Sequence, residues 1–248
     1  MKRKNLREGF ESLNLGSHVC CIYGNKEEKL SMLVEFMEIG LERNEKCLYV
    51  FDECSKEKLV ERFKERGLEI DRLMDSGKFE FLTKRETYLK DGYFSPDKMF
   101  ELLQDEQEKA LDQGFSGLRA TGEMTWFFTD TPGVEKLMEY ESRLNEFIQG
   151  KETVILCQYN ENKFSADKLL DVIHTHPKVV INDFMYENHY YMPVDIFHSM
   201  LKGEVDEESY EKIKRDLIEE ARLTGVERSS EKKGESLSDL LQTLEKLE

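Results

Sequence analysis

The chain has 248 residues with a formal net charge of −16, and 39% of the residues are hydrophobic, enough for one large core or two small ones. The acidic balance argues against a nucleic-acid-binding protein, because phosphate contacts need clustered Lys and Arg, so we expect no direct nucleic-acid partner. No apolar run approaches the roughly 18 residues of a membrane span, and the five cysteines show no C-x-x-C spacing, so we expect a cytoplasmic protein with reduced thiols and no membrane partner.

The first part of the chain alternates between strand and helix patterns. After a flexible N-terminus over residues 1–14, apolar runs at 18–23 and 47–51 predict two strands. Both runs are continuous rather than alternating, which is typical of strands buried on both faces of a parallel sheet. Between them, a helix is predicted from the spacing of Leu30, Leu33, Val34, Met37 and Leu41.

The same alternation continues to about residue 191. Further strands are predicted at 79–83, 116–121 and 153–159. Further helices are predicted at 59–68, with Gly67 as the C-cap, and at 95–110, 131–150 and 165–173. Residues 178–191 then suggest one or two more strands at a sheet edge. Strand and helix alternate five times, so we predict an α/β fold with a doubly wound, mostly parallel sheet flanked by helices.

The composition changes after residue 203, where large apolar residues become rare. Residues 204–248 form a predicted helical tail, and residues 15–203 form the predicted domain. The last apolar stripe of the tail consists of Leu237, Leu240, Leu241, Leu244 and Leu247. A stripe of this kind must be buried somewhere, and we predict a homodimer whose contacts involve the tail.

Polar and aromatic residues collect where the predicted parallel strands end. In such sheets ligands bind outside the carboxyl ends of the strands. Asp52, Tyr23 and Tyr159 follow or end three of the strands, and the fourth carries Arg119, Glu123 and Trp126. We predict a small-molecule pocket at this rim, with Arg119 and Glu123 as polar anchors and Trp126 as a lid.

An enzyme is the less favoured interpretation, because no standard catalytic motif occurs. The loop after the first strand has neither G-x-x-x-x-G-K-[ST] nor G-x-G-x-x-G, and two glutamates follow it in the first turn of the helix. A degenerate RecA-type nucleotide-binding protein or ATPase with Glu123 as base is the alternative. A third alternative is an interaction module that works through its tail helices.

A metal site is the other chemistry that the sequence raises. The candidate ligands are His18, Cys20, Cys21, Cys157, His174 and His176. Alternation along a strand places His18 and Cys20 on one face. Buried free cysteine is a common core residue, however, and these residues show no recurrent ligand spacing. We therefore expect no metal and no cofactor.

Several runs, in order, resemble the MEDS family, the methanogen/methylotroph sensory domain. They include His-Val-Cys-Cys-Ile-Tyr at 18–23, Gly-Leu-Arg-Ala-Thr-Gly-Glu-Met-Thr-Trp at 117–126, Leu-Cys-Gln-Tyr at 156–159 and His176-Pro177. The resemblance covers about residues 15–200. It implies a RecA-like fold without a phosphate loop, a sensory input module in a signalling protein, and a small organic ligand such as a one-carbon compound. With this resemblance, the candidate ligand-binding residues are His18, Tyr23, Arg119, Glu123, Trp126, Cys157, Tyr159 and His176.

Overall fold

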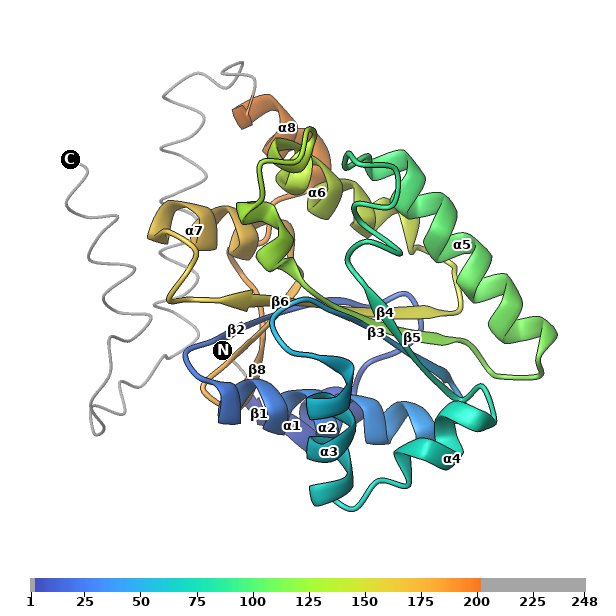
Figure 1. Cartoon of the computed structure of the whole chain (residues 1–248). Helices are drawn as coiled ribbons and strands as arrows, with labels where there is room; N and C mark the ends of the chain where they lie inside the picture. Colours follow the sequence, from blue (N-terminus) through green and yellow to red (C-terminus); the bar gives the residue numbers. More distant parts are fainter. Residues whose placement is uncertain (1–2, 202–248) are drawn as a thin grey trace.

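The computed structural model describes residues 3–201, which form an α/β unit around one central sheet (Figure 1). The strands are β1 (Arg3–Asn5), β2 (His18–Tyr23), β3 (Lys46–Phe51), β4 (Phe79–Thr83), β5 (Leu118–Glu123), β6 (Thr153–Asn160), β7 (Lys178–Ile181) and β8 (Phe184–Glu187). Their order across the sheet is β1-β8-β7-β2-β6-β5-β3-β4. The strands from β7 to β4 in this order are parallel, and β8 and β1 add an antiparallel end. The predicted mostly parallel sheet is confirmed.

Helices cover both faces of this sheet. The α-helices are α1 (Leu6–Glu11), α2 (Lys26–Glu42), α3 (Lys56–Glu65), α4 (Ile70–Asp75), α5 (Pro96–Asp112), α6 (Leu137–Phe147), α7 (Ala166–Thr175) and α8 (Val194–Leu201). Two 3-10 helices, η1 (Met124–Phe128) and η2 (Val134–Lys136), join β5 to α6. Helices α1 to α4 lie under one face, and α5 to α8 lie over the other (Figure 1). Because the chain reverses its direction across the sheet after β4, right-handed crossovers place the later helices on the opposite face.

The core consists of two apolar layers separated by the sheet. Side chains alternate along β2, so that Cys20 and Ile22 enter the layer under α5 to α8, while Val19 and Cys21 enter the layer over α2. Both layers are closed to solvent at β2, where every residue is buried. This double burial is the physical reason why the β2 sequence is continuously apolar.

Glycine sets a boundary in two helical segments, one where the sequence predicts it and one where it does not. Gly67, expected to end the helix that follows β3, adopts a φ of 89° just after α3 and separates it from α4. The helix predicted from Pro132 begins with η2 and becomes α-helical only at Leu137, because Gly133 adopts a left-handed φ of 91°. A left-handed residue cannot continue an α-helix, so both boundaries are fixed by glycine.

The N-terminus differs from the flexible segment that we predicted. β1 pairs with β8, and α1 follows it directly, with Asn5 as its N-cap. Phe10 is fully buried and its ring lies 5.3 Å from the ring of Phe36 on α2. The spacing of Leu6 and Phe10 gives this short helix one apolar face, and α2 covers it. The predicted tail, residues 204–248, lies outside the described residues.

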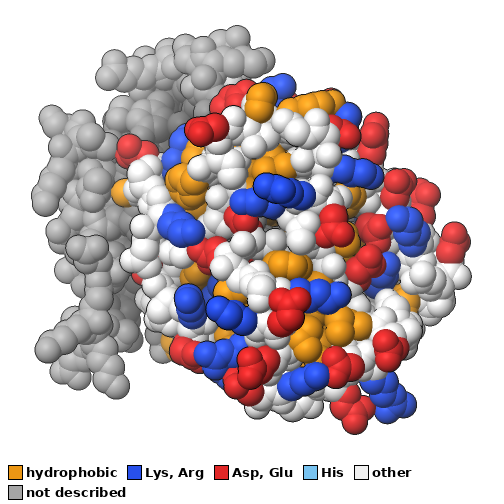
Figure 2. Space-filling model, in the orientation of Figure 1, with side chains coloured by type: hydrophobic (Ala, Val, Ile, Leu, Met, Phe, Trp, Pro, Cys, Tyr) orange, Lys and Arg blue, Asp and Glu red, His pale blue; other side chains and the backbone are white. Residues whose placement is uncertain are grey.

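None of the helices within residues 3–201 combines the length and the apolar content that crossing a membrane requires. On the face seen in Figure 2, basic and acidic side chains are interspersed over the described part of the chain. No part of that face is uniformly basic.

Candidate functional site

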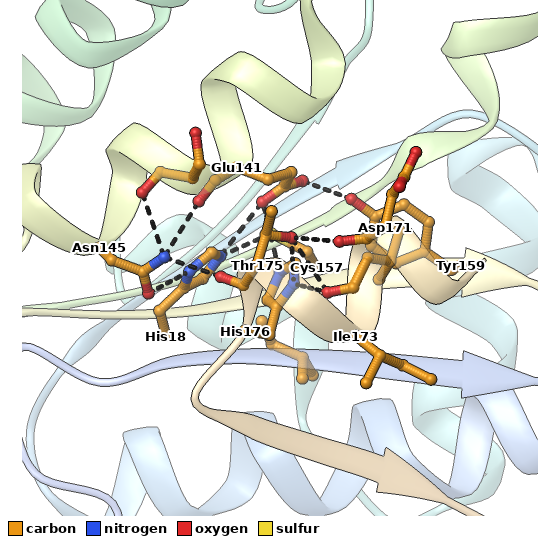
Figure 3. Close-up of polar contacts among 12 residues, drawn as sticks. His18, Glu141, Asn145, Cys157, Tyr159, Asp171, Ile173, Thr175 and His176 are labelled. Atoms are coloured by element: carbon orange, nitrogen blue, oxygen red, sulfur yellow. Dashed lines mark hydrogen bonds and ion pairs between the residues drawn. The ribbon is translucent and has the colours of Figure 1, made fainter. Parts of the chain in front are cut away.

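Five polar side chains meet in the apolar layer between the sheet and helices α6 and α7 (Figure 3). This inner cluster consists of His18, Glu141, Cys157, Tyr159 and His176. β2 and β6 are neighbouring parallel strands, which brings His18 close to Cys157 on the same face. α6 supplies Glu141, and His176 is the residue that follows α7. All five side chains are at most 2% exposed.

The donor atoms of the inner cluster converge on one carboxylate oxygen. Glu141 Oε2 lies 3.2 Å from His18 Nε2 and 3.3 Å from His176 Nε2. The Cys157 thiol donates to the same oxygen at 3.3 Å, and Cys157 Sγ lies 3.4 Å from His18 Nε2. The other oxygen, Oε1, accepts the Tyr159 hydroxyl at 2.5 Å. Figure 3 shows these contacts together above the sheet.

Neighbouring groups fix which nitrogen of each imidazole carries a proton. The Asn145 amide nitrogen donates to the Thr175 carbonyl at 2.7 Å, so Asn145 Oδ1 faces His18 Nδ1 at 3.0 Å as an acceptor. His176 Nδ1 lies 2.7 Å from the carbonyl oxygen of Val172. Since both partners accept, both Nδ1 atoms must donate, and a neutral ring then presents an Nε2 lone pair to the cluster.

Burial governs the protonation of this cluster. Burial, and the neighbouring His176 ring 4.1 Å away, lower the pKa of His18 and favour its neutral form. Burial and the Glu141 carboxylate raise the pKa of the Cys157 thiol and of the Tyr159 hydroxyl. As it stands, Cys157 is therefore a protonated thiol and a poor nucleophile, although an imidazole lies beside it.

A second polar group, the rim network, lies at the carboxyl ends of β2, β3 and β5. It consists of Tyr23, Lys29, Tyr49, Glu53 and Glu123. Lys29 Nζ lies 2.6 Å from Glu123 Oε1 and 3.1 Å from Glu53 Oε2. Tyr49 donates to Glu123, and Tyr23 donates to Glu53 at 2.8 Å. Burial lowers the pKa of Lys29, but the two carboxylates outweigh burial and raise it.

The rim network leaves Glu123 no free oxygen for acid–base work. Its Oε2 accepts the backbone N–H groups of Asp52 at 3.1 Å and Glu53 at 2.7 Å. A general base needs an oxygen that can reach the proton it removes. Both oxygens of Glu123 are engaged inside the fold, which disfavours the alternative of a RecA-type ATPase with Glu123 as base.

The start of α2, where a phosphate loop would lie, is capped by the chain itself. Asn25 Oδ1 accepts the N–H groups of Glu27 and Glu28, each at 3.0 Å. The Glu28 carboxylate accepts the N–H of Gly24 at 2.8 Å. The backbone amides of Gly24, Glu27 and Glu28 are the donors that would hold a phosphate, and the Glu28 carboxylate lies beside them. The geometry thus disfavours a nucleotide at this loop.

The structure does not bring Arg119 and Trp126 to one cavity, so that part of the predicted rim geometry is wrong. Arg119 Nε donates to Glu45 at 2.5 Å, and its guanidinium lies 4.6 Å from the ring of Phe36 on α2. Trp126 belongs to the layer on the other face of the sheet. The alternation of β5 explains the separation, because the Arg119 side chain points to the α2 face while the chain turns over the opposite face after Glu123.

Trp126 is a core residue in this structure rather than a lid. It is fully buried, and its ring lies 4.8 Å from Tyr88 and 4.4 Å from Phe94. A cavity of about 400 Å³ lies between β4 and α5, with Tyr88 among its lining residues. None of the eight predicted ligand-binding residues lines this cavity.

The eight predicted residues therefore fall into separate places. Four belong to the inner cluster: His18, Cys157, Tyr159 and His176. Two belong to the rim network, Tyr23 and Glu123. Their role in ligand binding stays a prediction.

Sequence reasoning missed Glu141, which completes the inner cluster, and Asn145, which contacts His18. Both lie on the buried face of α6, one turn apart. A carboxylate and an amide at i and i+4 within an apolar stripe are unusual, because burying such groups is unfavourable unless they have partners. This pattern was a usable signal for a polar site beneath α6.

Comparison with known proteins agrees with the sequence resemblance. Residues 17–177 match the family profile described as MEDS, MEthanogen/methylotroph, DcmR Sensory domain. The transcriptional repressor DcmR of Methylorubrum extorquens is 24% identical over 160 residues, which are 64% of this chain and 57% of that protein. The chain thus spans a little over half the length of this relative.

Among solved structures, the KaiC-like protein PH0186 of Pyrococcus horikoshii OT3 superposes with a TM-score of 0.47 and 17% sequence identity. The match covers 66% of this chain and 69% of that one. The family assignment rests on the profile, which covers more than half of the chain and includes both the inner cluster and the rim network. The chain belongs to the MEDS family of sensory domains.

Proposed function

We propose that this chain is the ligand-sensing input module of a signalling system, and that the inner cluster receives the signal. The observation that carries the proposal is the convergence of His18, Cys157 and His176 on one oxygen of Glu141 inside an apolar layer. The proposed ligand is a small organic molecule of the one-carbon class. It would engage the thiol and imidazole groups of the cluster.

The energetics of burial support a functional rather than a structural reading of the cluster. A buried ion pair rarely stabilises a fold more than apolar residues of the same size would. Here one carboxylate, two imidazoles and a thiol are withdrawn from water within the layer that holds the apolar core under α5 to α8. Groups with shifted pKa values in such surroundings are concentrated at functional sites.

Helix α6 offers a physical route from the inner cluster to the end of the described chain. Glu141 lies in the cluster, and the adjacent Ser142 contacts His198 Nε2 of α8 at 2.8 Å. A second link begins at His176, the residue that follows α7. Its carbonyl accepts a hydrogen bond from Asn188 Nδ2 at 2.7 Å. A shift of α6 or of His176 would therefore reach α8, which precedes the C-terminal residues.

The output of the module would be regulatory. The relative from Methylorubrum extorquens is named a transcriptional repressor, and this chain matches 57% of its length. We propose that this chain reports to a separate signalling partner protein. Direct contact with DNA is not part of the proposal, because the chain carries a net charge of −16.

A ligand panel tests the proposal. The full chain is heated with methanol, methylamine, methanethiol or dichloromethane, which present oxygen, nitrogen, sulfur and halogen atoms. A ligand at about 100 times its Kd adds roughly 2.7 kcal/mol of stability, which corresponds to a rise in Tm of about 5–10 °C for a domain of this size. We expect such a rise with at least one compound, together with slower amide exchange in α6 and α8.

The matched control uses two cysteines of neighbouring strands. Cys157→Ser alters the inner cluster, whereas Cys21→Ser alters a buried thiol on the opposite face of the sheet. The response should disappear in the first variant and persist in the second. Unchanged melting and exchange with all four compounds, or an equal response in Cys157→Ser, would contradict the proposal.

A further inference from the structure

With both imidazoles neutral, the inner cluster sets nitrogen lone pairs against a carboxylate. Both imidazoles donate from Nδ1, so in their neutral forms both Nε2 lone pairs face the Glu141 carboxylate, at 3.2 and 3.3 Å. His176 Nε2 is buried and has no hydrogen-bond partner. Lone pairs opposed at these distances repel unless a positive charge lies between them. Protonating both rings would create two buried cations beside one carboxylate, with their ring centroids 4.1 Å apart. Burial opposes such a pair of like charges.

The distances among the donor atoms fit a single ion. The donor atoms of His18, Glu141, Cys157 and His176 all lie within 4.8 Å of one another. The contacts around Glu141 Oε2, and the contact of Cys157 Sγ with His18, span 3.2–3.4 Å. Tetrahedral zinc with bonds of about 2.0–2.3 Å has ligand atoms roughly 3.3–3.8 Å apart. Small movements of these side chains would therefore complete a tetrahedron.

The charges and donor types also agree with a divalent ion. Two neutral imidazoles, one thiolate and one carboxylate carry a total charge of −2, which a divalent cation neutralises. Imidazole and thiolate are the ligands of Zn²⁺ and related transition metals, whereas Mg²⁺ and Ca²⁺ prefer oxygen. We propose that the inner cluster binds one divalent transition-metal ion of the Zn²⁺ class through Nε2 of His18 and His176, Sγ of Cys157 and Oε2 of Glu141. On binding, the ion replaces the thiol proton of Cys157, which leaves to solvent.

The groups that hydrogen-bond to the four proposed ligands are arranged as a metal site requires. Metal-binding imidazoles usually donate their other N–H to an acceptor that orients the ring. Asn145 Oδ1 serves His18 in this way, and the Val172 carbonyl serves His176. Tyr159 holds Glu141 Oε1 and so leaves Oε2 as the single coordinating oxygen.

This site differs from the absence of a metal that the sequence led us to expect. Its ligands stand at positions 18, 141, 157 and 176, with no local spacing among them. Of the candidate ligands named from the sequence, His18, Cys157 and His176 meet here. Cys21 belongs instead to the opposite apolar layer. The inference rests on the proposed function only in treating the inner cluster as the functional centre.

Metal content is the direct test. The full chain is expressed with added Zn²⁺ and, in parallel, with added Fe²⁺, then purified without affinity metals and analysed for bound elements. We expect about one ion per chain. After chelation, the protein is titrated with Co²⁺, and a thiolate-to-cobalt absorption band in the near ultraviolet would identify Cys157 as a ligand.

Variants separate this site from other cysteines and histidines. Cys157→Ser should abolish the thiolate band, whereas Cys21→Ser should retain it. His18→Gln should lose the ion, whereas His189→Gln, outside the inner cluster, should keep it. Asn145→Ala, which removes the amide that orients His18 and donates to the Thr175 carbonyl, should weaken binding about 10–100-fold.

The proposal is overturned if the wild-type chain contains no stoichiometric transition metal from either culture and gives no thiolate band with Co²⁺. It is equally overturned if Cys157→Ser keeps both the metal and the band. Because the cobalt band is read on the wild-type chain, the test does not depend on the folding of any variant. A chain that responds to a one-carbon compound without any metal would contradict this inference and leave the proposed function standing. A metal-loaded chain that responds to none of the compounds would support this inference and contradict the proposed function.

Discussion

Glu53 lies at the centre of the rim network, and its carboxylate contacts two lysines, the Tyr23 hydroxyl and the Asn160 amide. Lys163 Nζ lies 3.0 Å from its Oε1, and Lys29 and Tyr23 contact Oε2. Burial alone would raise its pKa, but these three partners outweigh burial and lower the pKa to about 2. The carboxylate form is therefore favoured by the fold relative to the unfolded chain.

This shift predicts a specific loss of stability in acid. The pKa of Glu53 is lower in the folded than in the unfolded chain, so its contribution is complete above pH 4.5 and is lost as the pH falls toward about 2. We expect the free energy of unfolding of the wild type to fall by roughly 2 kcal/mol more than that of Glu53→Gln across this window. Urea unfolding at several pH values measures it. Glu61→Gln, an exposed carboxylate variant, should follow the wild type, and identical pH profiles for Glu53→Gln and wild type would refute the prediction.

Trp126 gives a second prediction at the scale of one residue, because it is the single tryptophan of the chain. Its ring is fully buried between Tyr88 and Phe94, so its fluorescence should be blue-shifted and poorly quenched by acrylamide. Replacing it by Ala should cost about 3–5 kcal/mol of stability, because a large cavity would remain. Red-shifted and freely quenched emission from the native chain would support the lid that the sequence suggested instead.

At the scale of elements, the connection from β5 to α6 depends on the backbone of Gly133. Its φ is 91°, and a Cβ atom there would lie 2.1 Å from the carbonyl oxygen of Phe94. Gly67 also has a left-handed φ, 89°, but a Cβ atom there would meet nothing within 4 Å. A side chain at either position would therefore strain the backbone, and at Gly133 its Cβ atom would also clash with the Phe94 carbonyl.

Alanine variants at Gly67 and Gly133 should therefore differ in stability. Gly67→Ala should cost about 1 kcal/mol, as expected for Ala in a left-handed conformation. Gly133→Ala should cost more, about 3 kcal/mol or above, because the loop carrying Phe94 must also move. Thermal unfolding of both variants measures the difference. Equal Tm values for the two would show that the 94–133 contact is not held as described.

At the scale of the whole molecule, the association state stays a prediction. The leucine stripe at 237–247 lies outside the described residues, and burying each leucine would contribute roughly 1.5–3 kcal/mol before ordering costs. We expect the full chain to be a dimer at micromolar concentration and a version ending at Gly203 to be a monomer. Light scattering measures both masses. A monomeric full chain would mean that the dimer prediction is wrong.

The sheet was predictable from the sequence because burial on both faces leaves a local trace. Strands such as β2 and β6 contain continuous apolar runs, and the helices between them carry one apolar face. The strand formed by residues 3–5 left no such trace. It is short, and only its pairing with β8 makes it a strand.

What the sequence determined by itself was the family, the alternation of strands and helices, and the residue types from which a site could be built. The periodicity of apolar residues and the order of motifs are both properties of the linear sequence, so neither requires the tertiary structure. The tertiary structure alone decided which of those residues meet. His18, Glu141, Cys157 and His176 come from two strands, one helix and the residue after another helix, and they face one another only because β2 lies beside β6 beneath α6 and α7. Arg119 and Trp126, close in sequence, are separated by the sheet because the alternation of β5 sends Arg119 to one face while the chain crosses to the other.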